Sequence, residues 1–154
     1  MVDIHKRQIY YSRTGEAPLS GWTSTSLDTG HWVHCDPGVR FRHLTMRSGQ
    51  PLIVLGECHS AVSGADAVGL LTKTDFSDLP QTLAKLGGRF HIIVGGILHR
   101  DAGGLLGLFY DEAGDLASTS LALAARGRAI AQDSIPHGVR IDWFPGPVTP
   151  AANI

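Results

Sequence analysis

The sequence predicts an α+β domain in which antiparallel sheets pack on each other and helices lie outside. Short extended runs separated by turn residues favour strands, and two separated stretches have the pattern of helices. Residues 51–57, "PLIVLGE", form an almost wholly apolar run of the kind that is buried on both faces of a sheet. The chain has 154 residues, of which 43% are hydrophobic. We therefore expect residues 1–154 to form one domain with a genuine core.

The first strands are predicted on either side of turn signals. Residues 7–13, "RQIYYSR", carry two adjacent tyrosines and a β-branched Ile, which favours a strand. Residues 31–35 and 39–46 are two further extended runs. In the second, Val39, Phe41, His43 and Thr45 alternate with Arg40, Arg42, Leu44 and Met46. The turn "DPG" at 36–38 lies between them, because Pro fixes φ and Gly accepts a positive φ. We expect these two runs to form a hairpin that "SGQP", residues 48–51, closes.

The strongest helix prediction covers residues 75–88, "DFSDLPQTLAKLGG". Either Ser77 or Asp78 can cap the amino end, and Pro80 suits a first helical turn. Gly87 can terminate the helix. The pattern therefore indicates a helix over most of this stretch.

The second half predicts three more strands, in residues 89–101, 106–112 and 115–120, joined by turns that contain glycine. The Ala/Leu-rich residues 120–132 predict a second helix. The tail, residues 137–154, contains a short extended run followed by prolines. We expect this tail to run over a surface rather than to form a further regular element.

Charge and cysteine content exclude several classes of function. The chain has 13 basic and 14 acidic residues and a formal net charge of -1, which argues against a nucleic-acid-binding face. No apolar run reaches the roughly 18 residues that a membrane helix needs. Cys35 and Cys58 are too few for a disulfide framework, and the amino end has no secretory signal pattern. We expect a cytoplasmic protein with no membrane or nucleic-acid partner.

Three segments occur in an order that resembles a known family. They are "LGGRFHIIV" at 86–94, "RDAGGLLGLFY" at 100–110 and "LASTSLALAA" at 116–125, and "IDWFPGPVTP" at 141–150 follows them. Together they resemble the N-terminal, glutaminase-like domain of asparagine-synthetase-like proteins, a class II glutamine amidotransferase domain. The resemblance implies the Ntn-hydrolase fold, an αββα sandwich of antiparallel sheets flanked by helices.

Arg100, Asp101 and Gly104 form the structural motif within this resemblance. Glycines between the two strands permit close backbone approach and unusual φ and ψ angles. Arg100 beside Asp101 can satisfy backbone groups of the turn and partly pair a charge. We interpret the pair as a turn that stabilises the fold, and the matching pair in the family is also mainly architectural.

The resemblance implies a nucleophile that this sequence does not supply. Enzymes of this family use the first residue of the mature chain, normally Cys, with its own α-amino group as the base. Here Met1 is followed by Val2, which carries no nucleophile, and Cys35 and Cys58 are internal. We therefore expect no catalytic residue and no glutaminase activity.

The matching substrate-binding positions are incomplete. The family's Asn-Gly-Glu falls on Leu55, Gly56 and Glu57, and an apolar Leu55 cannot donate to an oxyanion. Residues 35–40, "CDPGVR", do not replace the Arg-Gly-Pro-Asp stretch that holds the glutamine carboxylate. Asp66 matches the Asp that binds the glutamine amine. Gly56, Glu57 and Asp66 are therefore the candidates for a residual pocket that binds a small polar ligand, and no cofactor is expected.

The expected partner is an ATP-dependent synthetase domain or subunit of asparagine-synthetase type, because degenerate domains of this kind accompany such amide-forming enzymes. The Ser-Gly-Gly-x-Asp-Ser loop of that synthetase does not occur in these 154 residues, so we expect no synthetase domain here. The chain would then act as a scaffold or docking module. One alternative is a hydrolase or amidotransferase activated by internal cleavage before Cys35, Thr23 or another nucleophile. A second is a small-ligand or self-associating binding module, that is, a homo-oligomer.

A zinc site is the remaining hypothesis, built on His31, His34, Cys35, Cys58 and His59. On a pleated strand, residues one or three positions apart point to opposite faces. That rule separates His31 from His34, Cys35 from His34, and Cys58 from His59. We therefore expect satisfied or exposed histidines and no metal site.

Overall fold

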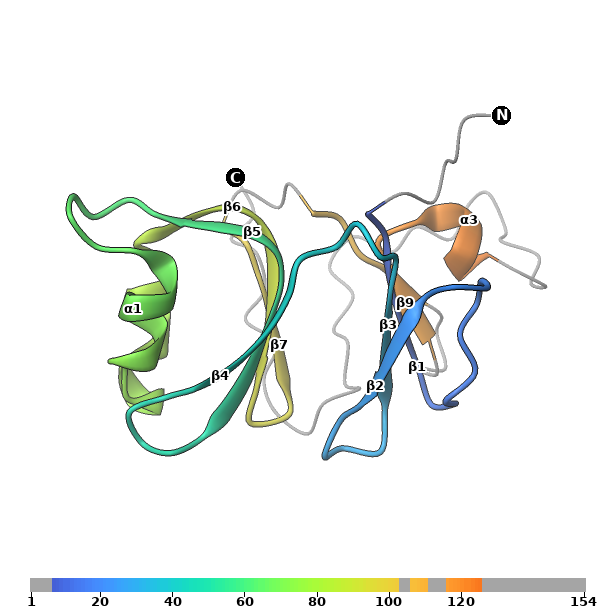
Figure 1. Cartoon of the computed structure of the whole chain (residues 1–154), viewed down its shortest axis with the longest axis horizontal. Helices are drawn as coiled ribbons and strands as arrows, with labels where there is room; N and C mark the ends of the chain where they lie inside the picture. The colour runs from blue at the N-terminus through green and yellow to red at the C-terminus, as the bar shows by residue number, and fades with distance from the viewer. Residues whose placement is uncertain (1–6, 103–105, 111–115, 126–154) are drawn as a thin grey trace. The chain divides into compact units, whose positions relative to one another are not determined.

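The computed structural model describes residues 7–102, 106–110 and 116–125 (Figure 1). These residues form two compact units with one antiparallel sheet each. The first unit holds residues 7–39 with 107–110 and 116–125, and the second holds residues 40–102 with Leu106. The mixture of antiparallel sheets with a few short helices confirms the α+β prediction. None of the helices in the described ranges is long and apolar enough to cross a membrane.

The sheet of the first unit has five strands in the order β2-β3-β1-β9-β8. Their bounds are β1 Ile9–Ser12, β2 Thr23–Ser26, β3 Trp32–Cys35, β8 Phe109–Tyr110 and β9 Leu116–Ser118. Helix α3, Leu121–Ala124, follows β9, and the Ser120 hydroxyl caps it by accepting the N–H of Leu123. One face of the sheet is apolar, because alternate residues Ile9, Tyr11, Val33, Cys35 and Ala117 are buried.

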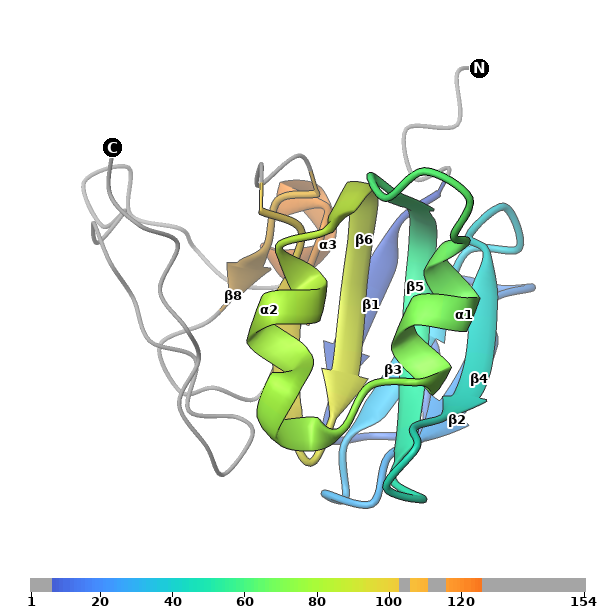
Figure 2. The same cartoon turned by 90° about the vertical axis from the view of Figure 1, so that its left-hand side faces the viewer.

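The sheet of the second unit has four strands in the order β4-β5-β6-β7. Their bounds are β4 Phe41–Thr45, β5 Pro51–Ser60, β6 Leu86–Val94 and β7 Ile97–Arg100. Between β5 and β6 the chain forms α1 Ala67–Thr72, the 3-10 helix η1 Phe76–Asp78 and α2 Leu79–Leu83. Figure 2 shows α1 and α2 lying across one face of this sheet.

The core of the second unit lies between this face and the helices. Its strand residues include Leu52, Val54, Phe90 and Ile92, and the helices add Leu71 and Leu79. Each of these side chains is at most 1% exposed. Burying a Leu, Val or Phe side chain is worth about 1.5–3 kcal/mol, so this apolar cluster is the main stabilising contact between helices and sheet.

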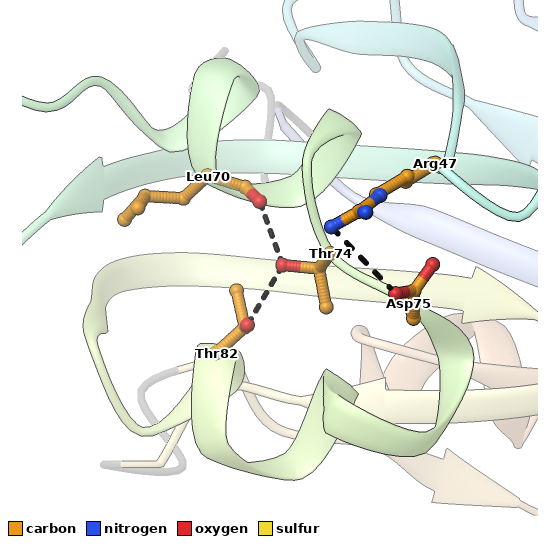
Figure 3. A network of polar contacts seen from close by, with 5 residues as sticks. All are labelled: Arg47, Leu70, Thr74, Asp75 and Thr82. Carbon is orange, nitrogen blue, oxygen red and sulfur yellow. Dashed lines mark hydrogen bonds and ion pairs between the residues drawn. The ribbon is translucent and has the colours of Figure 1, made fainter.

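Polar contacts fix the helices to the β4–β5 turn (Figure 3). The hydroxyl of Thr74 donates to the carbonyl of Leu70 at 2.7 Å and lies 2.8 Å from the Thr82 hydroxyl. The backbone N–H of Arg47 donates to the carbonyl of Thr74, and its guanidinium is 4.0 Å from the Asp75 carboxylate. Thr74 therefore joins the end of α1 to α2 and to the turn between β4 and β5.

The hairpin predicted around residues 36–38 was wrong, although the turn itself is present. The Asp36 carbonyl accepts the N–H of Val39, and its carboxylate accepts the N–H of Gly38. However, β3 pairs with β1 and β2, whereas β4 pairs with β5. The turn at 48–51 therefore joins β4 to β5. Turn chemistry fixes the local path of the chain, but it does not determine which strands become neighbours.

The helix predicted over 75–88 is shorter in the structure. Pro80 lies in the first turn of α2, as expected, and Asp78 is the capping residue without a side-chain hydrogen bond. The helix ends at Leu83, and Gly87 lies inside β6 instead of terminating a helix. Helix α1 and the polar strand β2 were not predicted from the sequence patterns.

The strand predicted over 89–101 is a hairpin, because Gly95 and Gly96 form a turn with positive φ angles of 57° and 75° between β6 and β7. Strands β8 and β9 lie within the two other predicted runs. Of the helix predicted over 120–132, α3 is observed, and residues 126–132 lie outside the described part of the chain. The tail at 137–154 also lies outside it.

Candidate functional site

The candidate residues of the second unit begin at Gly56, in the middle of β5. Its φ is +94°, and a Cβ atom at this position would overlap the carbonyl oxygen of Arg89 on β6. The N–H of Gly56 donates to the carbonyl of Arg40 at 2.8 Å. Glycine is therefore required by the backbone, because both its conformation and the close approach of β6 exclude a side chain.

Glu57 and Asp66 each have a contact of their own. A Glu57 carboxylate oxygen lies 3.2 Å from the Arg40 guanidinium, and both side chains are about half exposed, at 50% and 53%. Asp66 caps α1, since its exposed carboxylate accepts the N–H of Gly69 at 2.7 Å. Cys58, next to Glu57, belongs to the core under the helices, so Glu57 points to the opposite face of the sheet. Because α1 covers the helix face, the structure places Glu57 and Asp66 on different sides of the sheet.

Asp101 is hydrogen-bonded to Leu106, at the other end of the Gly-containing residues 101–106. It is 5% exposed, its carboxylate accepts the N–H of Leu106 at 3.0 Å, and its own N–H donates to the carbonyl of Phe90. Arg100 ends β7 with an exposed side chain. Gly104 lies outside the described residues. These two hydrogen bonds hold the buried Asp101 to Phe90 on β6 and to Leu106.

His91 lies close to Leu106 and is completely buried. Its Nε2 lies 3.2 Å from the carbonyl oxygen of Leu106. A carbonyl only accepts, so Nε2 carries the proton. Burial lowers the pKa of His91 to about 4, with a further lowering by Arg100 that the Leu106 hydrogen bond and Asp101 oppose. His91 is therefore neutral at physiological pH and donates to the Leu106 carbonyl in that state.

A second polar cluster lies on the first unit, around His34. Its Nε2 is 3.0 Å from the Ser12 hydroxyl and 3.1 Å from the Thr14 carbonyl, and its Nδ1 is 2.8 Å from the Ser24 hydroxyl. Trp32 stacks along the ring at 6.4 Å between centroids. The strand register produces this cluster, since His34 is directly opposite Ser24 on β2. Ser12 and Ser24 could not be recognised as neighbours of His34 from the sequence, because their proximity depends on strand pairing.

The hydrogen-bond directions decide against Ser12 as the partner of a basic His34 nitrogen, and the only hydroxyl that donates to His34 within the described residues is that of Ser24. Nε2 of His34 donates to the Thr14 carbonyl, which leaves Nδ1 to accept from the Ser24 hydroxyl. The Ser12 hydroxyl also donates to the Thr14 carbonyl, at 2.7 Å. No basic nitrogen therefore faces the Ser12 proton, and His34 itself is 0% exposed. Burial lowers the pKa of His34, with the Thr14 bond opposing that shift, so the imidazole is held neutral.

The two cysteines are not positioned as nucleophiles. Burial, and secondarily the charge of Asp36, raises the pKa of Cys35 to about 12. Burial raises the pKa of Cys58 to about 11, against a lowering by Arg42. Cys35 also pairs with Ile9 and Thr23 on the neighbouring strands, so cleavage before it would cut β3 inside the sheet. These positions do not favour a hydrolase processed at Cys35, whereas Thr23 is exposed at the start of β2.

The histidines and cysteines of the zinc hypothesis do not gather. Cys58 is buried whereas its neighbour His59 is exposed, and His31 lies 3.2 Å from the Thr29 hydroxyl through Nδ1. In the described ranges, no group of three or more His, Cys, Asp or Glu side chains could hold a metal ion.

Comparison of the chain with protein-family models, with curated proteins and with solved structures gives no match. The function proposed below therefore rests on the residues and their geometry, together with the sequence resemblance.

Proposed function

We propose that this chain is a non-catalytic glutaminase-like domain, which serves as a scaffold or docking module for an ATP-dependent, amide-forming synthetase of asparagine-synthetase type. Two features support the αββα assignment: both sheets are antiparallel, and the helices α1 and α2 cover one of them. The segment order in the sequence, from the Gly-x-Phe strand to the Ser-capped helix, agrees with this assignment.

The observation that carries the proposal is the position of Leu55. It precedes Gly56 and Glu57, where the family has the Asn that stabilises the oxyanion, and its side chain is 0% exposed. Losing one oxyanion donor costs roughly 10²–10³ in rate. At the start of β1, moreover, Ile9 is preceded by Gln8, and its backbone N–H donates to the Thr119 hydroxyl at 2.8 Å. The backbone nitrogen of Ile9 is therefore an amide, and it cannot act as a base in the way that a free α-amino group does.

Ammonia release from glutamine tests the non-catalytic part of the proposal. We expect the purified chain to release no more ammonia than a protein-free blank, and Leu55→Asn to release no more than the wild type. An authentic glutaminase in the same assay is the positive control. Ammonia release by the wild-type chain above the blank, with an intact mass that shows no internal cleavage, contradicts the proposal.

The docking part is tested with the synthetase itself. We expect a synthetase of asparagine-synthetase type encoded beside this chain to elute with it in size-exclusion chromatography. We also expect ATP-dependent amide formation to fall when the chain is omitted. Equal amide formation with and without the chain, together with separate elution, contradicts a docking role.

A further inference from the structure

Among the described residues, nothing pairs with the outer edge of β4, which is a row of backbone hydrogen-bonding groups. β4 pairs with β5 over its full length, Phe41 to Thr45, without a bulge, and it is the terminal strand of the four-stranded sheet. In the parts of the chain that are described, no strand pairs with its other side. An edge of this kind can accept a further strand.

The register determines which backbone groups face outward. Met46 donates to Gln50 and Gly56 donates to Arg40, so positions 40 and 46 are hydrogen-bonded to β5. Hydrogen-bonded and non-bonded positions alternate along an antiparallel pair. Arg42 and Leu44 therefore also face β5, whereas the N–H and C=O groups of Phe41, His43 and Thr45 point to the outer edge. Three donors and three acceptors are thus available to an incoming strand.

The charge along this edge has one sign. Residues 37–56 contain three Arg and one His and no Asp or Glu. Arg40 is paired with Glu57 at 3.2 Å, and Arg47 has the looser contact with Asp75 at 4.0 Å. Arg42, in the middle of β4, makes no ion pair with any described residue and is partly exposed. An acidic side chain placed beside Arg42 would supply the missing opposite charge.

The two faces of β4 differ in chemistry. Arg42 lies on the helix face, because it is opposite Val54 of the core. Phe41 and His43 lie on the other face, with ring centroids 4.8 Å apart. Side chains of an added strand would alternate between these faces. The matching strand therefore carries acidic residues on one face and apolar residues on the other.

We propose that the outer edge of β4 docks an extended segment of a partner protein, in which acidic and apolar residues alternate. A second copy of this chain does not fit the same edge, because two β4 strands would bring their Arg42 side chains within range of repulsion. The inference uses β4 alone and does not depend on the proposed amidotransferase relationship. An acidic strand could dock here even if the chain proved to be a glutaminase.

Peptide binding to the full chain tests this proposal by fluorescence anisotropy. The probe is a fluorescein-labelled, amidated peptide of about eight residues in which Glu alternates with Val, long enough to cover one strand. We expect saturable binding in the micromolar range. A Lys-Val peptide of the same length, and a Glu peptide with Pro at its central Val positions, should each bind at least about tenfold more weakly. The proline peptide keeps the charge but loses backbone donors, so it separates strand addition from simple charge attraction.

Matched variants assign the binding to β4. Arg42→Gln should weaken binding about tenfold or more, whereas Arg42→Lys, which keeps the charge, should stay within about threefold of wild type. His43→Pro removes one outward N–H and should weaken binding by a similar factor, whereas His43→Val keeps that N–H and should bind as wild type does. Circular dichroism and thermal unfolding identify any variant that fails to fold. The Lys-Val and proline-containing control peptides are measured on the wild-type chain, so their results hold even if a variant does not fold.

Three results would overturn the proposal. No binding of the Glu-Val peptide by a folded chain would show that the arginines only protect the edge from aggregation. Equal binding of the proline peptide would show charge attraction without strand addition. Sedimentation of the wild type as a dimer that His43→Pro dissociates would assign the edge to a second copy of the chain.

Discussion

Gly56 on β5 and Arg89 on β6 approach so closely that a Cβ atom on Gly56 would overlap the Arg89 carbonyl oxygen. The same relationship recurs two register positions along the ladder, where a Cβ atom on Gly88 would overlap the carbonyl oxygen of Glu57. Both glycines have positive φ angles, +94° and +120°. The β5–β6 pair therefore depends on two glycines, one on each strand, which flank the Glu57–Arg89 pair of its register.

The first prediction concerns this close approach. Gly56→Ala should lower the free energy of unfolding by about 2–4 kcal/mol, since the new methyl group displaces a backbone carbonyl and strains φ. Gly87→Ala is the matched control, because Gly87 lies on the same sheet with open space at its Cβ position and no positive φ. That variant should change stability by about 0.5 kcal/mol or less, or stabilise slightly. Urea unfolding of both variants measures the difference, and equal stabilities would contradict the steric argument.

Local sequence patterns predicted much of the strand content but not the pairing. The apolar run at 51–57 and the residues of β1, β3 and β4 are readable from side-chain type. β2, with the sequence Thr-Ser-Thr-Ser, has no hydrophobic alternation and exists because β3 provides its hydrogen bonds. Such tertiary context overrides intrinsic preference.

In the candidate site, too, local features were predictable from the sequence, whereas contacts made by strand pairing were not. Gly56 and Asp101 could be selected from the sequence, since their local backbone requirements are strong. The contacts of His34 with Ser12 and Ser24 could not be predicted from the sequence. Ser12 is 22 positions and Ser24 is 10 positions from His34, and only the register of three strands brings them together. Helix α1 was not predicted, since its six residues include a glycine and its stability comes from packing Leu71 into the core.

The second prediction compares two carboxylates with different burial. Asp101→Ala leaves the N–H of the buried Leu106 without this acceptor, which should cost about 1–3 kcal/mol. Asp66→Ala removes an exposed helix cap and should cost about 1 kcal/mol or less. Asp101→Asn keeps an acceptor oxygen and should fall between wild type and Asp101→Ala. Chemical denaturation gives the ranking, and a smaller loss for Asp101→Ala than for Asp66→Ala would show that the buried contact is unimportant.

The third prediction concerns thiol reactivity. The pKa values of about 12 for Cys35 and about 11 for Cys58 leave little thiolate at pH 8, and both side chains are buried. Relative to the unfolded chain, each should react with a disulfide reagent roughly a hundredfold more slowly or worse. Cys35→Ser and Cys58→Ser assign the remaining thiol in each case. Rapid reaction of either native thiol would reopen the case for a cysteine nucleophile.

The last prediction concerns the pH dependence of stability. The pKa of His91 is lowered from an ordinary value of 6.5 to about 4, mainly by burial. Between these values the unfolded chain binds more protons than the fold, so the stabilisation is complete above pH 6.5 and is lost as the pH falls toward 4. From pH 8 to pH 5, His91 alone should lower the free energy of unfolding by about 2 kcal/mol.

The pKa values of His34 and His99 are lowered in the same direction by burial, so replacing His91 should remove part of the loss rather than all of it. We expect urea unfolding at pH 8 and pH 5 to give a smaller difference for His91→Gln than for wild type. His59→Gln, which changes an exposed residue of β5, should keep the wild-type difference. Comparing differences between two pH values cancels any loss of packing that the substitution itself causes. An unchanged pH difference in His91→Gln would mean that the buried imidazole takes up its proton without unfolding the turn at Asp101.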